Sequence, residues 1–313
     1  MANFTRSEAW KNFDLGQELA ISGAFIYNGL RTFYRMQTLV NTDEIFEFLY
    51  GLAIGFERLL KVCVVLLEHD TAMDQSSFEA SLVTHNHLDL LDRVRKHRAI
   101  TLGRPHTRLL KLLVTFYKTH RYDRYTLSPR WEPDKEREGL KQLLEANLHV
   151  AINDTEPFAI ENKQEYRAHI QSVVYKVARS LFDIVHQRAS ELNLYTYELR
   201  HGSKAAVVFM DRTSKLEDDD VLWKELLVFL MNTKETSEAL EFLRGIDPLP
   251  FDKALVSDYL QCFRSDSSTP SVREELEELY LGLKDPGERL RMLNVIGNPH
   301  YLFDIDDDVG PDQ

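Results

Sequence analysis

Basic side chains gather in one stretch of this sequence, residues 93–130. The stretch holds eleven Lys or Arg residues against a single acid, Asp123, so its formal charge is +10. Since the whole chain of 313 residues carries −12, the other 275 residues carry −22. A basic surface on an otherwise acidic protein attracts polyanions and keeps them away from the rest of the molecule. This separation of sign predicts a site for a phosphate-rich ligand.

A helix expected over residues 107–121 arranges several of these cations. At 100° per residue, four of them fall in one narrow sector, and the apolar residues of the segment face away from it. The four are Arg104, Arg108, Lys111 and Lys118. Lys and Arg neutralise backbone phosphates, while tyrosine rings stack on bases. The predicted phosphate-binding residues are Arg93, Lys96, Arg104, Arg108, Lys111, Lys118, Arg121, Tyr122, Arg124 and Tyr125.

The alternative interpretation of the basic stretch is an internal ion-pair face. Acids elsewhere in the chain, such as Glu47, Glu138 and Asp183, would then neutralise the cations. The two interpretations differ in one observable property. An open site needs cations without carboxylate partners, whereas an internal face pairs each of them.

His120 is the candidate proton-transfer group in this stretch, because it lies beside Arg121 and close to Arg124. An imidazole that titrates near neutral pH, flanked by two anion-binding groups, is the minimum equipment for RNA cleavage without a metal. The same histidine could instead form part of the binding face.

No motif in the sequence predicts a cofactor or a metal. His85, Asp89 and Asp92 could share one helical face, but a fourth ligand is missing. The segment Gly202-Ser203-Lys204 and the acids at 218–220 are too far apart to predict a nucleotide and metal site. A tight turn and a separate helix with an acidic N-terminus account for them. Glycine loops for nucleotides, nucleophile elbows and zinc motifs are not found.

Composition favours a mainly α-helical protein. Glycine (13) and proline (10) are scarce, and long stretches are rich in Leu, Glu, Lys and Arg. Aromatic and β-branched residues around Gly202 predict one β-hairpin over residues 194–211. Only two cysteines occur, and no apolar run is long enough to cross a membrane, so we expect a cytoplasmic protein that does not enter membranes.

The order of the expected helices suggests two regions. Helices are expected over residues 7–40, 45–69, 78–98, 107–121, 132–149 and 161–194, with the nearly continuous apolar run of 45–69 at the centre. The Ser-Pro pair at 128–129 favours a boundary near residue 130. We therefore expect a helical bundle with a basic face over 1–130 and a helical region over 131–313. The latter ends in an acidic tail, 304–313.

Three short motifs in order carry a family resemblance. The first is Glu57-Arg58-Leu59-Leu60-Lys61, the second is His85 or His87 followed by Leu88 and Leu91, and the third is a Tyr and then Arg-Tyr ending at Tyr125. With these motifs, residues 20–125 resemble the HEPN superfamily. The resemblance implies an up-down bundle of four or five helices that binds RNA or nucleotides, pairs as a homodimer and serves in prokaryotic defence or toxin-antitoxin systems.

Ribonucleases of that superfamily carry an Arg, four to six residues and then a His. The matching region has no such pair, whereas Arg179 and His186 have the spacing farther along the chain. Three hypotheses follow: an RNA- or polyanion-binding protein, a catalytically silent subunit that binds a protein partner in a defence complex, or a metal-independent endoribonuclease that uses Arg179 and His186.

Overall fold

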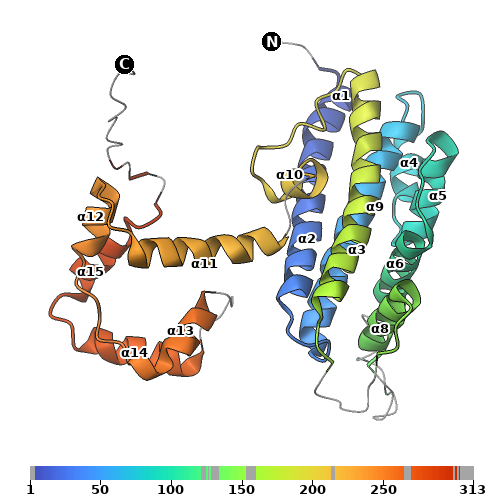
Figure 1. Ribbon diagram of the computed structural model, residues 1–313. Helices are drawn as coiled ribbons and strands as arrows, with labels where there is room; N and C mark the ends of the chain where they lie inside the picture. Colours follow the sequence, from blue (N-terminus) through green and yellow to red (C-terminus); the bar gives the residue numbers. More distant parts are fainter. Residues whose placement is uncertain are drawn as a thin grey trace, which may run out of the picture. The chain divides into compact units, whose positions relative to one another are not determined.

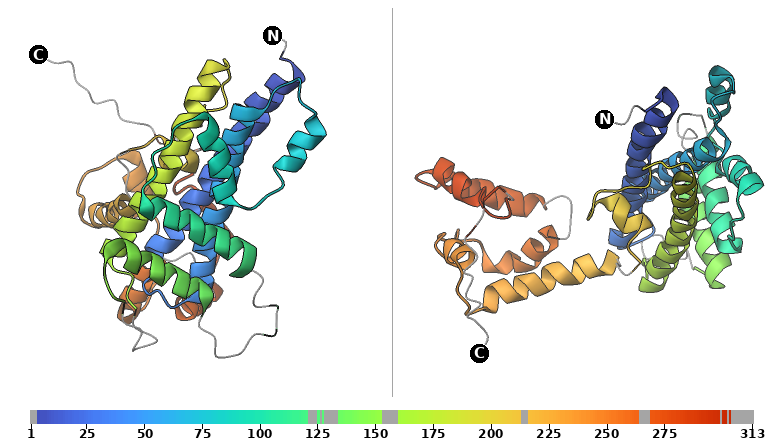
Figure 2. Two further views of the ribbon diagram at one scale, coloured as in Figure 1. Left: turned by 90° about the vertical axis from the view of Figure 1, so that its right-hand side faces the viewer. Right: turned by 90° about the horizontal axis from the view of Figure 1, so that it is seen from above.

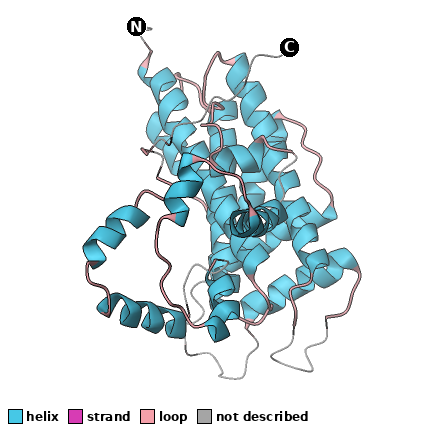
Figure 3. Ribbon diagram, turned by 60° about the vertical axis from the view of Figure 1, so that its left-hand side comes forward, coloured by secondary structure: helices cyan, strands magenta, loops and turns pink. Residues whose placement is uncertain are grey.

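The computed structural model describes residues 4–120, 125, 127, 134–152, 160–212, 216–263, 269–298, 300, 301 and 303. Within these residues the chain is mainly α-helical, which confirms the expected class (Figure 1). Only helices and loops appear in the described part of the chain (Figure 3), apart from an isolated bridge between Thr38 and Glu161. The chain divides into two compact units, Met1–Leu216 and Glu217–Gln313.

The first unit is built around α3 (Thr42–Glu68), the apolar run that the sequence places at the centre. Sixteen of its residues are buried, because hydrophobic side chains occupy nearly every face of this helix. It packs along α2 (Leu15–Arg35), and the two backbones approach closely at Gly55. A Cβ there would lie 2.6 Å from Cγ1 of Ile26, so this contact requires glycine.

Further helices complete the bundle on the other sides of α3. Figure 2 shows α9 running along the same bundle as α2 and α3, while α8 lies against α6. The elements of this unit are α1 (Arg6–Ala9), η1 (Trp10–Asp14), α2, α3, α4 (Gln75–Ser81), α5 (His87–His97), α6 (Arg104–Thr115), η2 (Phe116–His120), α8 (Lys135–Leu148), α9 (Gln164–Glu191) and α10 (Lys204–Phe209).

The expected boundary at residue 130 lies inside this first unit. Leu144 of α8 and Val174 and Leu181 of α9 are fully buried in the same hydrophobic core as the side chains of α3. A boundary at 130 would cut through that core, so the unit ends at Leu216 instead. Described residues on both sides of position 130 therefore belong to one bundle.

The β-hairpin expected over residues 194–211 does not form. Residues 204–209 form α10, and the hydroxyl of Ser203 accepts a hydrogen bond from the Ala206 N–H at 3.2 Å as its N-cap. Ala205, Val208 and Phe209 are buried at helical spacing, against α2 and α9. Packing on one helical face therefore overrides the β-propensity of the segment.

The second unit is helical as well. Its elements are α11 (Leu216–Asn232), α12 (Glu238–Arg244), η3 (Lys253–Leu255), α13 (Val256–Cys262), α14 (Pro270–Leu281) and α15 (Pro286–Leu293). From residue 217 onward, none of the residues that the structure describes is buried. The acidic tail at 304–313 lies outside the described residues. Across the described helices of both units, none combines the length and the apolar character of a membrane span.

Candidate functional site

Three arginines, two in α5 and one directly after it, form ion pairs with acids. Arg93 binds Glu68 through two nitrogens, with Nη2 donating to Oε2 at 2.5 Å, and its Nη1 donates to the Ser81 carbonyl at 3.0 Å. Arg98 donates to both carboxylate oxygens of Glu191, at 2.5 and 2.6 Å. Arg95 pairs with Asp92 at 3.3 Å. For these three arginines, the internal ion-pair interpretation describes the structure better than an open phosphate site does.

The cations of α6 and η2 are placed differently. Arg104, Lys111 and Lys118 are exposed, and no described carboxylate forms an ion pair with any of the three. Lys96 at the end of α5 is likewise exposed without a described carboxylate partner. Arg108 is exposed, and its Nη1 donates to the Ala146 carbonyl at 2.8 Å, at the C-terminus of α8. An arginine in that position satisfies a carbonyl that the helix leaves without a partner.

Two of the acids named above as possible internal partners, Glu138 and Asp183, interact with other residues and not with the cations of α6 and η2. Glu138 accepts a hydrogen bond from Gln142 at 2.8 Å, and Asp183 pairs with Arg212 at 3.8 Å. The exposed face formed by Arg104, Arg108, Lys111 and Lys118 is named the α6 ridge below.

The remaining predicted residues of the basic stretch fall partly outside the described structure. Arg121, Tyr122 and Arg124 lie outside the described residues, as does the side chain of His120. Tyr125 is described and is 89% exposed, so its ring is available for stacking.

A pocket of about 530 Å³ lies beside the C-terminal end of this ridge. The π-helical turn η2 connects the two, because Tyr117 lines the pocket while Lys118 is exposed next to it. The Tyr117 ring stacks near Tyr50, with 6.5 Å between the ring centroids. The aromatic and polar lining consists of Trp10, Glu18, Tyr50, Glu57, Arg58, Lys61, His85 and Tyr117.

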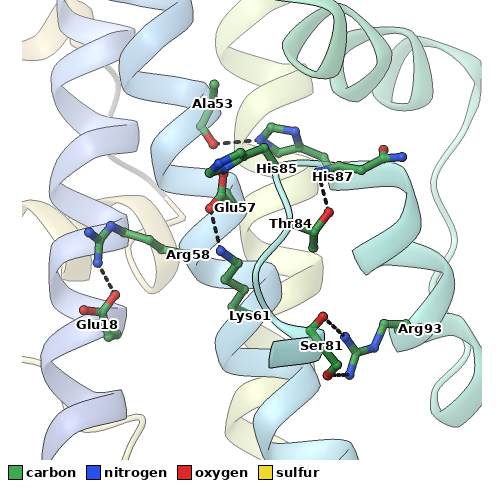
Figure 4. A network of polar contacts seen from close by, with 11 residues as sticks. Glu18, Ala53, Glu57, Arg58, Lys61, Ser81, Thr84, His85, His87 and Arg93 are labelled. Carbon is green, nitrogen blue, oxygen red and sulfur yellow. Dashed lines mark hydrogen bonds and ion pairs between the residues drawn. The ribbon is translucent and has the colours of Figure 1, made fainter. Parts of the chain in front are cut away.

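Glu57 is the centre of the polar network in this pocket (Figure 4). It is nearly buried on α3, one turn before Lys61, whose Nζ donates to Oε1 at 2.6 Å. The other oxygen, Oε2, accepts from Nδ1 of His85 at 2.9 Å. Burial raises the pKa of Glu57, but the hydrogen bonds from Lys61 and His85 outweigh burial and hold the pKa below its ordinary value. The carboxylate is therefore ionised at neutral pH.

The two histidines before and at the start of α5 have different environments. His87 is completely buried, and its Nε2 donates to the Ala53 carbonyl of α3 at 2.7 Å. Burial lowers the pKa of His87, so this histidine is a neutral anchor of α5 on α3. The side chain of His85 is 52% exposed, and its ring lies 4.7 Å from that of Tyr117. Since Nδ1 donates to Glu57, Nε2 of His85 carries the lone pair that can accept a proton.

Arg58 and Glu18 form an ion pair between α3 and α2 at the same pocket (Figure 4). The lining thus contains two cations and two carboxylates, paired with each other, around one partly exposed imidazole. Such a site favours a polar ligand that exchanges hydrogen bonds with the rim, and it can also orient a general base. In the described part of the chain, no group of three or more His, Cys, Asp or Glu residues is arranged to hold a metal ion.

Arg179 and His186 lie on one face of α9, and both contact α10 or the segments that flank it. Arg179 donates from Nε to the Val208 carbonyl at 3.2 Å and from Nη2 to the Asp211 carbonyl, and its guanidinium lies 4.3 Å from the Tyr175 ring. His186 makes an edge-to-face contact with Tyr197 at 4.5 Å. These contacts give the pair a role in holding α10 and its flanking loops on α9.

The pocket is the part of the site that sequence reasoning missed. The spacing of Glu57 and Lys61 predicts only an ordinary helix ion pair, and the spacing of His85 with Asp89 and Asp92 suggests only an incomplete metal site. Tyr117 comes from a third segment, and nothing in the local sequence says that it meets the other two. The short motifs at 57–61 and 85–91 contain Glu57, Lys61 and His85, and they were the available signal.

Comparisons with protein families, with curated proteins and with solved structures find no match to this chain. The α6 ridge and the pocket are therefore the features of the molecule that point to a function.

Proposed function

We propose that this chain is a HEPN-like protein that binds RNA, or another phosphate-rich ligand, along the α6 ridge. The observation that carries the proposal is the contrast between two sets of cations. Arg93, Arg95 and Arg98 are neutralised by acids, whereas Arg104, Lys111 and Lys118 are exposed without a described carboxylate partner. Cations that remain unneutralised on one helix face are free to displace the counterions of a phosphate backbone.

The neighbouring aromatic side chains support a single-stranded ligand. Tyr125 is exposed, and Tyr117 lies at the pocket beside Lys118. Stacking on an aromatic ring contributes about 1–3 kcal/mol per base and needs an unpaired base. A strand that follows the ridge would reach the pocket with its next nucleotide.

The test is fluorescence anisotropy of a labelled single-stranded RNA with the full chain. Lys111→Glu together with Lys118→Glu is expected to weaken binding at least about tenfold at moderate salt, since two phosphate contacts become repulsive. The matched control is Arg95→Glu with Arg212→Glu, which makes the same charge change at two exposed residues that already pair with acids. The proposal is wrong if the ridge variant binds RNA as tightly as the parent, with helicity unchanged by circular dichroism.

A second candidate function is metal-independent RNA cleavage, favoured by the contact between Glu57 and His85 at the pocket. A carboxylate that fixes Nδ1 of a histidine leaves Nε2 as an oriented base. In this reaction Nε2 of His85 takes the proton of a ribose 2′-hydroxyl, the oxygen attacks the adjacent phosphorus, and the 5′-oxygen leaves with a proton from water. The products are a 2′,3′-cyclic phosphate and a 5′-hydroxyl.

Cleavage assays with EDTA distinguish the candidates. If the chain is a ribonuclease of this kind, His85→Ala abolishes cleavage and His186→Ala, a packing histidine, does not. Loss of cleavage with His186→Ala alone would assign the chemistry to the Arg179 and His186 pair. Absence of cleavage in every variant leaves RNA binding, or a silent interaction subunit, as the function.

A further inference from the structure

The helices of the second unit have defined ends, but none of its described residues is fully removed from solvent. Asp252 and Asp285 accept backbone N–H bonds at 2.8 Å as N-caps of η3 and α15, and Ser237 caps α12 in the same way. Yet no described residue beyond Leu216 is buried. Capping of this kind specifies helices, but a stable unit also needs apolar side chains removed from water.

The helix α11 shows most clearly what is missing. Its second half, Leu226-Leu227-Val228-Phe229-Leu230-Met231, is an uninterrupted apolar run that covers every face of the helix. Five of these six side chains, all but Leu227, are between 47% and 76% exposed. A helix that is apolar all round is normally enclosed by other protein. A patch of this kind on a free protein is a characteristic interaction site.

The apolar surface continues from α11 onto α13. The ring of Trp223 stacks near Phe263, with 6.0 Å between centroids, and Phe263 itself is 65% exposed. Val256 and Leu260 on α13 are also exposed, at 48% and 41%. The combined surface is named the α11–α13 face below.

Charge decides what can cover this face. Residues 217–313 hold 9 Lys or Arg and 23 Asp or Glu, a formal charge of −14, whereas residues 1–216 hold 29 and 27, a formal charge of +2. Two such units facing each other would bring −28 together, and RNA or an anionic membrane would be repelled in the same way. A cationic protein combines the apolar contact with complementary charge.

We propose that the 217–313 unit binds a basic protein partner, which lays an amphipathic, Lys- or Arg-rich helix on the α11–α13 face. The apolar side of the partner helix covers Leu226, Leu230 and Phe263, and its cations meet the surrounding acids. This is a helix-in-groove interaction in which burial supplies most of the affinity and charge selects the partner. The inference is independent of RNA binding, which uses residues of the first unit.

The probe is a labelled 18-residue peptide of Leu and Lys with helical amphipathic spacing, measured by anisotropy with the full chain in about 150 mM salt. Two further peptides are controls: a scrambled sequence of the same composition and an amphipathic peptide of Leu and Glu. The expected result is binding of the amphipathic cationic peptide at least tenfold tighter than of the scrambled peptide, with no binding of the Leu and Glu peptide.

Variants of the chain locate the contact. Leu226→Glu with Leu230→Glu is expected to remove peptide binding, and Leu226→Ala with Leu230→Ala, which preserves helix propensity, to weaken it severalfold. The matched control Thr236→Glu with Ser271→Glu adds the same charge at exposed polar positions and should leave binding unchanged. RNA binding of all these variants stays at the parent level.

Three results would overturn the proposal. Equal binding of the amphipathic and scrambled peptides would mean that charge alone attracts them, and no binding of either would mean that the face does not accept a basic helix. A dimer in light scattering that becomes a monomer with Leu226→Glu and Leu230→Glu would show that a second copy covers the face.

Discussion

The two units of this chain are both built from helices but differ in what those helices bury. In the first unit, α3 buries sixteen of its residues against other helices, and the net charge is close to zero. In the second unit, helix ends are capped, yet α11 exposes its apolar run and the charge is strongly negative. Local signals are enough to make helices, whereas a fold depends on what covers them.

A phenylalanine-to-alanine substitution in each unit should reveal this contrast as a difference in the free energy of unfolding, and its effect should be the largest of those expected. Phe56→Ala removes a fully buried ring of α3 and is expected to lower the free energy of unfolding by about 3–5 kcal/mol. Phe229→Ala removes a ring that is 49% exposed and should cost less than about 1 kcal/mol in the isolated protein. Denaturant unfolding followed by circular dichroism measures both.

Equal losses from the two phenylalanine substitutions would mean that α11 is enclosed within the free chain. The cationic peptide provides a second measurement of the same difference. Bound peptide should stabilise the parent by mass action and the Phe229→Ala variant less.

The next effect concerns the polar network of the first unit. Glu57→Gln removes the negative charge that both Lys61 and His85 contact. We expect the free energy of unfolding to fall by about 2 kcal/mol at neutral pH. Because the pKa of Glu57 is lowered in the folded state, its contribution is fully present above the ordinary carboxyl pKa. The contribution is lost as the pH falls through the lowered value.

The measurement for this network is the free energy of unfolding as a function of pH for the parent and for Glu57→Gln. The two curves should converge on the acid side, below the ordinary pKa of a glutamate. A constant difference between them down to the lowest pH would mean that Glu57 is not held ionised by its neighbours.

The smallest effect lies at the edge of the first unit. His186→Ala removes the edge-to-face contact with Tyr197. It should lower the free energy of unfolding by about 1 kcal/mol, the usual value of such a pair. RNA binding and any RNA cleavage should not change. If His186→Ala left stability unchanged but abolished cleavage, the packing role assigned to this histidine would be wrong.

The sequence predicted the periodic elements of the first unit well, because burial and local pattern agree there. The expected helices over 45–69, 132–149 and 161–194 correspond to α3, α8 and α9. Prediction from the sequence failed where packing overrides local preference. The β-propensity of Val208 and Phe209 predicted a strand, but both residues lie on the buried face of a helix. The domain boundary failed for the same reason, since the core crosses residue 130.

The candidate site was only partly predictable. The α6 ridge follows from helical spacing alone, but the pairing of Arg93 with Glu68 depends on how α5 packs on α3. The pocket joins Glu57, His85 and Tyr117 from three segments, and their approach is a property of the tertiary fold. Sequence spacing identifies which residues share a helix face, and the fold decides which faces meet.

If the unpaired cations of the α6 ridge contact phosphates, RNA binding should weaken steeply as the salt concentration rises. Each phosphate contact with a single strand contributes about 0.7 to the slope of log affinity against log salt. Replacing Lys111 and Lys118 by Gln should therefore reduce the slope by about 1.4 relative to the parent. An unchanged slope in that variant would mean that Lys111 and Lys118 contact no phosphates and that the ridge is not the binding site.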